Sequence, residues 1–283
     1  MRRESMKNKT VIIVALVIVI VILAVILLSP GKKQKKETAK SESEEVLVLA
    51  GGSARVIVEQ VVERYKQVST DKVVPTYGDS GAICAQLQNV TNKGDILVVH
   101  DPFMDWAVKK GVIEKWDKMG YVDIVIVVPK GNPRGIREFK DLAQPGLRVG
   151  IGNQTYATSG VMVREMLKKL DYGEAIQKNV ALESKGHQER CTAVILGSLD
   201  AAIVWSVIAN LFKDKLDIIP IPRELYVDSV TSATYGVSDL KNVKFTVGLT
   251  KVGARKKSAV EFYNFFVKQL DIFEKSGLRM NPY

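Results

Sequence analysis

Four short segments place a hydroxyl or imidazole side chain beside glycine, where a strand-like run gives way to a helical pattern. They are Gly51-Gly52-Ser53, Gly78-Asp79-Ser80-Gly81, Thr158-Ser159-Gly160 and Gly186-His187. Serine and threonine can cap a helix there, and a helix start offers free backbone N–H groups and a partial positive charge. Ordinary capping explains any one segment alone. Several helix starts that converge on one cleft would bind an anion without arginine or lysine.

The chemistry-bearing residues do not form a catalytic or metal-binding pattern. Gly78-Asp79-Ser80-Gly81 is also similar to the nucleophile block of trypsin-like proteases, but that family is all-β with its histidine upstream, and His100 and His187 both lie downstream. Two histidines supply neither a metal-ligand cluster nor the carboxylate–histidine spacing of acid–base enzymes. No segment matches a dinucleotide or P-loop pattern. We therefore expect a protein that is not an enzyme and needs no cofactor.

The sequence contains two cysteines, Cys84 and Cys191. They allow one disulfide at most, and their spacing does not indicate metal binding. We expect both to be small helix residues, and the sequence leaves their redox state open.

An alternation of strands and helices from Val46 onward must position the four segments. Short apolar runs alternate with stretches whose apolar residues recur every three or four positions. This predicts an α/β protein with mainly parallel sheets, interrupted by a boundary at residues 129–133. The predicted strands are 46–50, 73–77, 96–100, 124–128, 147–151, 201–205, 218–221 and 243–249, and the predicted helices end at about 65 or span 82–90, 103–110, 159–170, 188–196 and 258–270.

The N-terminal region contains an unbroken apolar run of 18 residues, from Val11 to Leu28. A helix of this length spans about 27 Å, close to the hydrocarbon core of a bilayer. Because lysines follow the run instead of a small-residue cleavage site, we expect residues 1–28 to be a cytoplasmic stub and transmembrane anchor, with a cleaved signal as the alternative. Residues 29–45 predict a flexible charged linker. Basic residues flank the run on both sides, so they do not fix its orientation.

The formal net charge of +10 comes largely from the N-terminus, because residues 1–40 hold 9 of the 41 basic and 2 of the 31 acidic groups. The remainder is nearly balanced, which argues against nucleic-acid binding. The lysines after the apolar run either meet anionic lipid headgroups or belong to a solvated linker.

Successive blocks of the chain resemble the periplasmic molybdate-binding proteins of ABC importers. The blocks are 49–53, 77–81 with Gln86-Leu87, 94–96 leading to Asp101 and Met104-Asp105, 199–205 and, near the end, 259–266. Their order and spacing carry the resemblance, since no block is specific alone. It implies an α/β, two-lobed type II periplasmic-binding-protein fold, to which the apolar run adds the expected N-terminal transmembrane segment. Residues 46–128 plus 222–283 would form lobe 1 and residues 129–221 lobe 2.

The resemblance also implies a ligand site, because that family holds an oxyanion with serine hydroxyls and backbone amides, without a cationic side chain. Ser53 and Ser80 match the two binding serines, and Ser159 and His187 match backbone donors. Trp205 replaces a binding tyrosine, and its indole N–H donates but cannot accept.

Two residues at this implied site keep alternative interpretations. An ionised Asp79 must point away from a bound dianion, or the ligand differs. His187 is either a surface residue at a helix start or a cleft residue whose protonation would strengthen anion binding at lower pH.

The function that the resemblance implies is an extracytoplasmic, monomeric solute-binding protein. It would be held to the membrane through residues 11–28, capture molybdate or tungstate, and deliver it to an ABC permease. Two alternatives remain open: a binder of another anion such as sulfate or thiosulfate, and a tethered sensing module of the same fold that signals to a partner.

Overall fold

The computed structural model describes residues 45–88, 94–155, 157–232 and 236–282. These residues belong to one compact unit. The predicted anchor at 11–28 and all but the last residue of the predicted linker lie outside the described ranges. Within those ranges, no helix is both long enough and apolar enough to cross a membrane.

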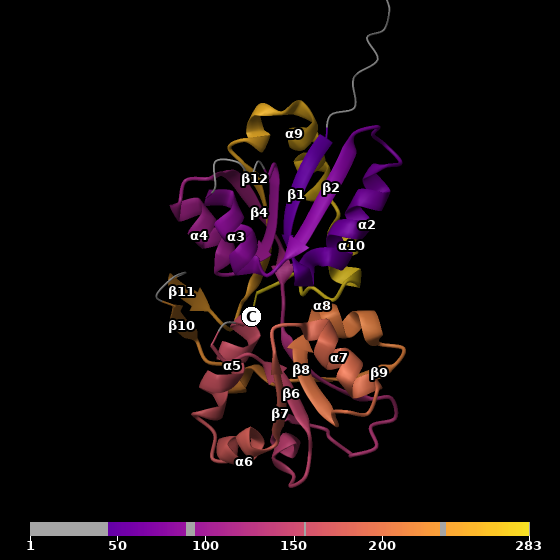
Figure 1. Cartoon of the computed structure of the whole chain (residues 1–283), viewed down its shortest axis with the longest axis vertical. Coiled ribbons are helices and arrows are strands. Elements are labelled where there is room, and N and C mark those ends of the chain that lie inside the picture. The colour runs from indigo at the N-terminus through magenta and orange to yellow at the C-terminus, as the bar shows by residue number, and fades with distance from the viewer. Residues whose placement is uncertain (1–44, 89–93, 156, 233–235, 283) are drawn as a thin grey trace, which may run out of the picture. The chain divides into compact units, whose positions relative to one another are not determined.

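The described residues form two five-stranded sheets with helices on both faces, and a separate two-stranded hairpin (Figure 1). In the first sheet, β2, β1 and β3 are parallel, and β12 is antiparallel to both β3 and β4. Four strands therefore run in one direction and one runs against them. In order across the sheet, the strands are β2 (Lys72–Gly78), β1 (Glu45–Gly51), β3 (Ile96–His100), β12 (Lys244–Thr250) and β4 (Ile113–Tyr121).

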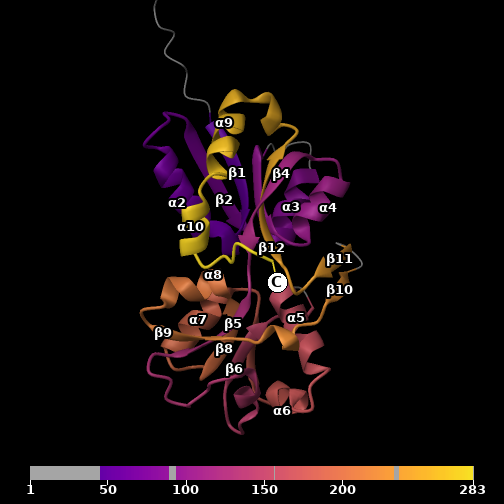
Figure 2. The ribbon, with the colours of Figure 1, turned by 180° about the vertical axis from the view of Figure 1, so that it is seen from behind.

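The central strands of the first sheet are buried on both faces, which explains their continuous apolar runs. On β3, Ile96 and Val98 join one hydrophobic cluster, whereas Leu97 and Val99 join another. Helices α2, α9 and α10 lie on one side of the sheet, and α3 and α4 lie on the other (Figure 2). Their bounds are α2 (Arg55–Tyr65), α3 (Ser80–Gln88), α4 (Phe103–Lys109), α9 (Lys257–Phe266) and α10 (Leu270–Lys275). The first sheet and these helices are called the first lobe.

The second sheet and its helices form the second lobe. Its strands, in order, are β7 (Val180–Ser184), β6 (Val149–Gly152), β8 (Ala201–Trp205), β5 (Ile124–Pro129) and β9 (Leu216–Pro220). Its helices are α5 (Thr158–Leu167), α6 (Gly173–Lys178), α7 (His187–Ile195) and α8 (Ser206–Ala209). The hairpin pairs β10 (Ser229–Ser232) with β11 (Gly236–Asp239), and short 3₁₀ helices are η1 (Gly52–Ala54), η2 (Phe139–Ala143), η3 (Asn210–Phe212), η4 (Arg223–Leu225) and η5 (Gly253–Arg255).

The two sheets share one strand order. The first sheet has the order β2-β1-β3-β12-β4 and the second has the matching order β7-β6-β8-β5-β9. In each, the first three strands are parallel, and an antiparallel strand stands between the third and the last. That antiparallel strand, β12 or β5, is the strand with which the chain enters the sheet from the other lobe. The expected α/β class is confirmed, while the mainly parallel sheets prove to be mixed.

The sheet pairing differs from the predicted lobe ranges at one strand. The predicted ranges place 124–128 in lobe 1, but β5 pairs with β8 and β9 of the second sheet. The chain therefore leaves the first sheet after Tyr121, and the Pro129–Pro133 segment follows the first strand of the second sheet. A proline-rich turn marks the end of a strand, which need not be the end of a lobe. The remaining lobe ranges stay predictions.

One carboxylate links the two passages of the chain between the lobes. Asp123 lies in the outward passage between β4 and β5 and accepts a hydrogen bond from Arg223 of the return passage. It also accepts from Arg279 of the C-terminal segment, at 3.3 Å from Nε. The backbone of Arg279 pairs with that of Tyr121 beside it. These three residues, Asp123, Arg223 and Arg279, are called the hinge cluster.

Both cysteines are buried and free, Cys84 on α3 and Cys191 on α7. Burial raises the pKa of each thiol to about 12, so neither is a thiolate at neutral pH. The prediction of small helix residues is confirmed.

Candidate functional site

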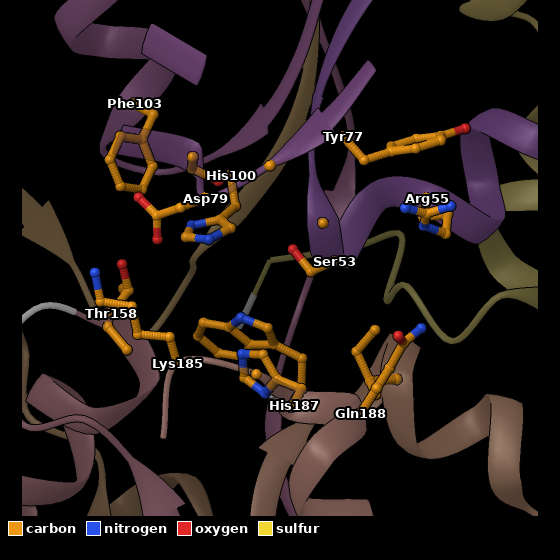
Figure 3. Close-up of a pocket in the computed structure, with 17 residues that line it drawn as sticks. Ser53, Arg55, Tyr77, Asp79, His100, Phe103, Thr158, Lys185, His187 and Gln188 are labelled. Atoms are coloured by element: carbon orange, nitrogen blue, oxygen red, sulfur yellow. Dashed lines mark hydrogen bonds between the residues drawn. The ribbon is translucent and has the colours of Figure 1, made fainter. Parts of the chain in front are cut away.

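A pocket of about 340 Å³ lies where the two lobes meet. Every residue that lines it stands at the carboxyl end of a parallel strand or in the few residues that follow: β1, β2 and β3 from the first lobe, and β6, β7 and β8 from the second. Crevices at the carboxyl ends of strands are the usual ligand sites of α/β sheets. Figure 3 shows the side chains that surround this space.

Four of the five predicted site residues line this pocket: Ser53, Ser80, His187 and Trp205. The hydroxyl of Ser53 points toward the pocket (Figure 3). Ser80 is the first residue of α3, and a Cβ added at Gly51 would lie 2.5 Å from its Oγ, so a larger residue at the end of β1 would force this hydroxyl to turn. The structure brings these four residues together, and their role in binding stays a prediction.

Ser159 is the predicted site residue that does not line the pocket. It is buried near the start of α5, whose first residue, Thr158, lines the pocket together with Ala157. The Oγ of Ser159 has no hydrogen-bond partner within the described ranges. Any contact of this residue with a ligand would therefore involve its backbone, which is the role that the resemblance implies.

The expectation that serine and threonine cap the helices at these junctions is wrong for α2, α5 and α7. The N-cap residues of these helices are Ala54, Ala157 and Gly186, and none makes a side-chain capping hydrogen bond. Ser53 lies one position before the N-cap of α2, and Ser159 lies two positions after the N-cap of α5. Neither hydroxyl therefore occupies the capping position. The first N–H groups of the three helices thus have no acceptor from their own cap side chain, and α5 and α7 begin at the pocket.

Helix α3 differs, because an acidic side chain caps it. Oδ1 of Asp79 accepts hydrogen bonds from the backbone N–H groups of Gly81 at 3.0 Å and Ala82 at 3.3 Å. Asp79 is exposed and lines the pocket. Its carboxylate therefore takes the place at this helix start that an anionic ligand would otherwise occupy, and it brings a negative charge to the pocket.

His187 is held in one tautomer by its neighbours. Its Nδ1 lies 2.9 Å from Nη2 of the buried Arg190 and accepts the backbone N–H of Trp205 at 3.2 Å. Arg190 also donates to the carbonyls of Ser184 and Ile203. Since both groups that face Nδ1 are donors, the ring proton sits on Nε2. Burial and the charge of Arg190 hold the pKa of His187 well below its usual value.

This arrangement revises the expectations for His187. It is the first residue of α7, as a helix-start residue would be, but it lines the pocket rather than the outer surface. A neutral ring with its proton on Nε2 is a constant hydrogen-bond donor. These contacts favour the neutral ring, and the hypothesis that protonation of His187 strengthens anion binding at lower pH stays a prediction.

The second histidine, His100, also lines the pocket, although it is not among the predicted site residues. It ends β3, and its Nδ1 lies 2.6 Å from the carbonyl oxygen of Asp101. The ring of Trp205 lies 5.7 Å from the His100 ring and 5.6 Å from the His187 ring. Trp205 thus joins the two histidines across the lobes. Burial lowers the pKa of His100, while the Asp101 carbonyl and Asp79 act in the opposite direction.

Two cationic side chains line the pocket, although the resemblance implied a site without them. Arg55 lies over the ring of Tyr77, 4.1 Å from its centroid, and forms an exposed ion pair with Glu59. Lys185 follows β7. The strand-end rule that located Ser53 also applies to His100 and Lys185, because each ends or directly follows a strand. Arg55, the first residue of α2, also stands a few residues after the end of β1.

The chain matches a family model described as bacterial extracellular solute-binding protein over residues 46–279. A Haemophilus influenzae relative, named only as a binding protein, is 24% identical over 212 residues, which are 74% of this chain and 79% of the relative.

Two solved structures share the fold at low sequence identity. The periplasmic molybdate-binding protein of Azotobacter vinelandii aligns with a TM-score of 0.66 and 17% identity, over 83% of this chain and 99% of that one. The sulfate-binding protein of Mycobacterium tuberculosis aligns with a TM-score of 0.66 and 18% identity, over 84% of this chain and 87% of that one.

Proposed function

Because the chain belongs to the family of bacterial extracellular solute-binding proteins, we propose that it captures a small oxyanion in the pocket between its lobes and passes it to an ABC permease. The observation that carries the proposal is the composition of the pocket: six strand ends, three from each lobe, supply its entire lining. A ligand held by both lobes favours their closed arrangement by its differential affinity for that state.

The charge of the ligand follows from the donors around the pocket. The N-caps of α5 and α7 offer no side-chain acceptor, so their first N–H groups are available to an anion. The hydroxyls of Ser53 and Ser80 and the fixed Nε2–H of His187 add further donors. Arg55 and Lys185 supply positive charge at the same pocket, against the single carboxylate of Asp79.

Molybdate or tungstate is the first candidate for the ligand, and sulfate is the second. The structural relatives named above bind molybdate and sulfate, which are tetrahedral and doubly negative. We further propose that the protein works outside the cytoplasm, held to the membrane through the apolar residues 11–28. The permease would then detect closure of the lobes around the anion.

A melting series of the purified full-length chain tests the proposal, with molybdate, tungstate, sulfate, thiosulfate and phosphate added separately. An anion at about 1,000 times its dissociation constant should add about 4 kcal/mol to the free energy of unfolding, because it binds only the folded state. Sodium chloride at the same ionic strength as each anion solution is the control. If none of the five raises the melting temperature above the chloride control, the oxyanion proposal is wrong.

A further inference from the structure

The hydrogen bond of His100 to the backbone determines which of its two ring nitrogens carries the proton when the ring is neutral. A carbonyl oxygen only accepts, so the 2.6 Å contact with the Asp101 carbonyl requires a proton on Nδ1. In the neutral ring, Nε2 then carries a lone pair and no proton. Within the described part of the chain, no hydrogen bond to Nε2 is found, and the ring points toward the space beside Lys185 and His187 (Figure 3).

The two histidines therefore offer opposite groups to the same ligand. His187 presents an Nε2–H that its neighbours hold in place, whereas neutral His100 presents an acceptor. An anionic oxygen beside the lone pair of His100 would be repelled, since neither partner has a proton to share. The repulsion disappears if either the ring or the anion carries a proton.

The charged groups around His100 do not settle its protonation on their own. Burial disfavours the charged ring, whereas the backbone carbonyl of Asp101 and the carboxylate of Asp79 favour it. The groups from the elements packed around it are Asp79 before α3, Asp101 on its own strand end, Asp105 of α4, Lys244 of β12, and Lys185 and His187 from the second lobe. The charge of a bound dianion would add to the carboxylates and move the balance toward the protonated ring.

We infer that His100 and the bound anion share one proton. A fully ionised oxyanion such as sulfate or molybdate binds together with one proton from solvent, which goes to Nε2 of His100. An oxyanion that carries its own hydroxyl, such as monohydrogen phosphate, keeps that proton, donates a hydrogen bond through it to neutral Nε2 and takes up no proton from solvent. This inference rests on the proposed function and makes His100 the residue that couples selectivity among oxyanions to pH.

Calorimetric titration of the full-length chain tests the inference, with sulfate or molybdate as the ligand in buffers of different ionisation enthalpy. We expect the measured enthalpy to change with buffer in proportion to about one proton taken up per anion. The dissociation constant should rise about tenfold per pH unit on the alkaline side of the pKa of His100 in the free protein, because proton and anion binding favour each other. Phosphate, measured at a pH where monohydrogen phosphate is the main species, should show neither effect.

A matched pair of variants assigns the proton to one histidine. His100→Gln keeps a polar side chain that does not titrate, so proton uptake should fall to zero. His187→Gln should weaken binding but keep the uptake. If His100→Gln does not fold, the ¹⁵N resonance of Nε2 in the wild-type protein reports the same protonation on addition of sulfate.

The outcomes separate this inference from the function on which it rests. Binding of sulfate or molybdate without proton uptake, or uptake that persists in His100→Gln, overturns the role of His100 and leaves anion capture intact. Failure of every oxyanion to bind overturns both.

Discussion

The three serines of the candidate site have different surroundings, although each follows or begins a comparable junction. Ser53 is partly exposed with its hydroxyl toward the pocket, and Ser80 is buried against Gly51 at the pocket wall. Ser159 is buried away from the pocket lining, with an Oγ that has no partner in the described chain. A hydroxyl contributes to binding only where it can reach the ligand, so the three should respond differently to substitution.

We predict that Ser53→Ala weakens oxyanion binding by about 1 to 3 kcal/mol, because a charge-assisted hydrogen bond is lost. Ser159→Ala serves as the matched control. It should leave the affinity within about twofold and should not lower the free energy of unfolding, since its Oγ has no hydrogen bond to lose. Titration calorimetry and urea unfolding of both variants measure these effects. An equal loss of affinity in both variants would contradict the prediction that the Ser53 hydroxyl, and not the Ser159 hydroxyl, contacts the ligand.

Arg190 shows how a residue outside the pocket determines what the pocket offers. It is completely buried, and its guanidinium bonds to the carbonyls of Ser184 and Ile203 as well as to the ring of His187. A buried cation is stable only when its donors find acceptors, and these three acceptors together with the hydroxyl of Ser184 bind the guanidinium. The sequence gives no indication of this role, because arginine in a helix is most often exposed.

At the scale of single elements, the start of α3 combines two effects of Asp79 that can be separated. Asn caps a helix about as well as Asp, so Asp79→Asn should leave the free energy of unfolding within about 0.5 kcal/mol. It should strengthen the binding of a dianion by about 1 kcal/mol, since a negative charge leaves the pocket. Asp79→Ala loses the hydrogen bonds to Gly81 and Ala82 and should destabilise the protein by about 0.5 to 2 kcal/mol.

Thermal melting and sulfate titration of the two Asp79 variants distinguish these effects. Weaker binding by Asp79→Asn would contradict the expected gain in affinity and show that the carboxylate supports binding, either by contact with the ligand or by favouring the protonated ring of His100.

The strands that the sequence predicted are mostly central, and those it missed lie at sheet edges. β3, β5 and β8 are buried throughout and appear as unbroken apolar runs. β4 and β7 are edge strands whose exposed positions carry Glu114, Lys115 and Glu183, so their runs are broken by charge. A strand that is covered on both faces has a continuous apolar run in the sequence, whereas a strand with one solvated face does not.

The candidate site was predictable to the extent that it lies at strand ends. Ser53, Ser80, His187 and Trp205 follow or end predicted strands or begin helices, and the pocket contains all four. His100 satisfied the same rule as the last residue of a predicted strand, but it has neither a hydroxyl nor a glycine beside it, the features on which the prediction was based. The direction of Arg55, which lies over the ring of Tyr77, depends on packing between separate elements, which sequence spacing does not specify.

At the scale of the whole molecule, the hinge cluster controls how the lobes are joined. Asp123 receives Arg223 from the return passage and Arg279 from the C-terminal segment, and its side chain is 24% exposed. The carbonyl of Asp123 also accepts the N–H of Ser206, at the start of α8. These contacts hold both passages against each other, so changes here should affect stability and the relative movement of the lobes together.

We predict that Asp123→Asn lowers the free energy of unfolding by about 1 to 3 kcal/mol, because two guanidinium groups lose their carboxylate in a partly buried place. Glu261→Gln is the control, since it breaks an exposed pair with Lys257 and should change stability by less than about 0.5 kcal/mol. Urea unfolding compares the two. Similar values for both variants would show that the cluster is an ordinary surface network.

The order of the chain makes the two lobes unequal partners. Residues 124–220 build the whole second sheet without interruption, whereas the first sheet needs β12 from beyond that stretch to be complete. Glu45 at the start of β1 and Asp271 of α10, which pairs with Arg64 of α2, both belong to the first lobe. Whatever is fused or fastened upstream of Glu45 is therefore carried by the first lobe. The second lobe is an insertion in the first and is joined to it at both of its ends. Ligand binding would therefore move the second lobe relative to the tethered first lobe.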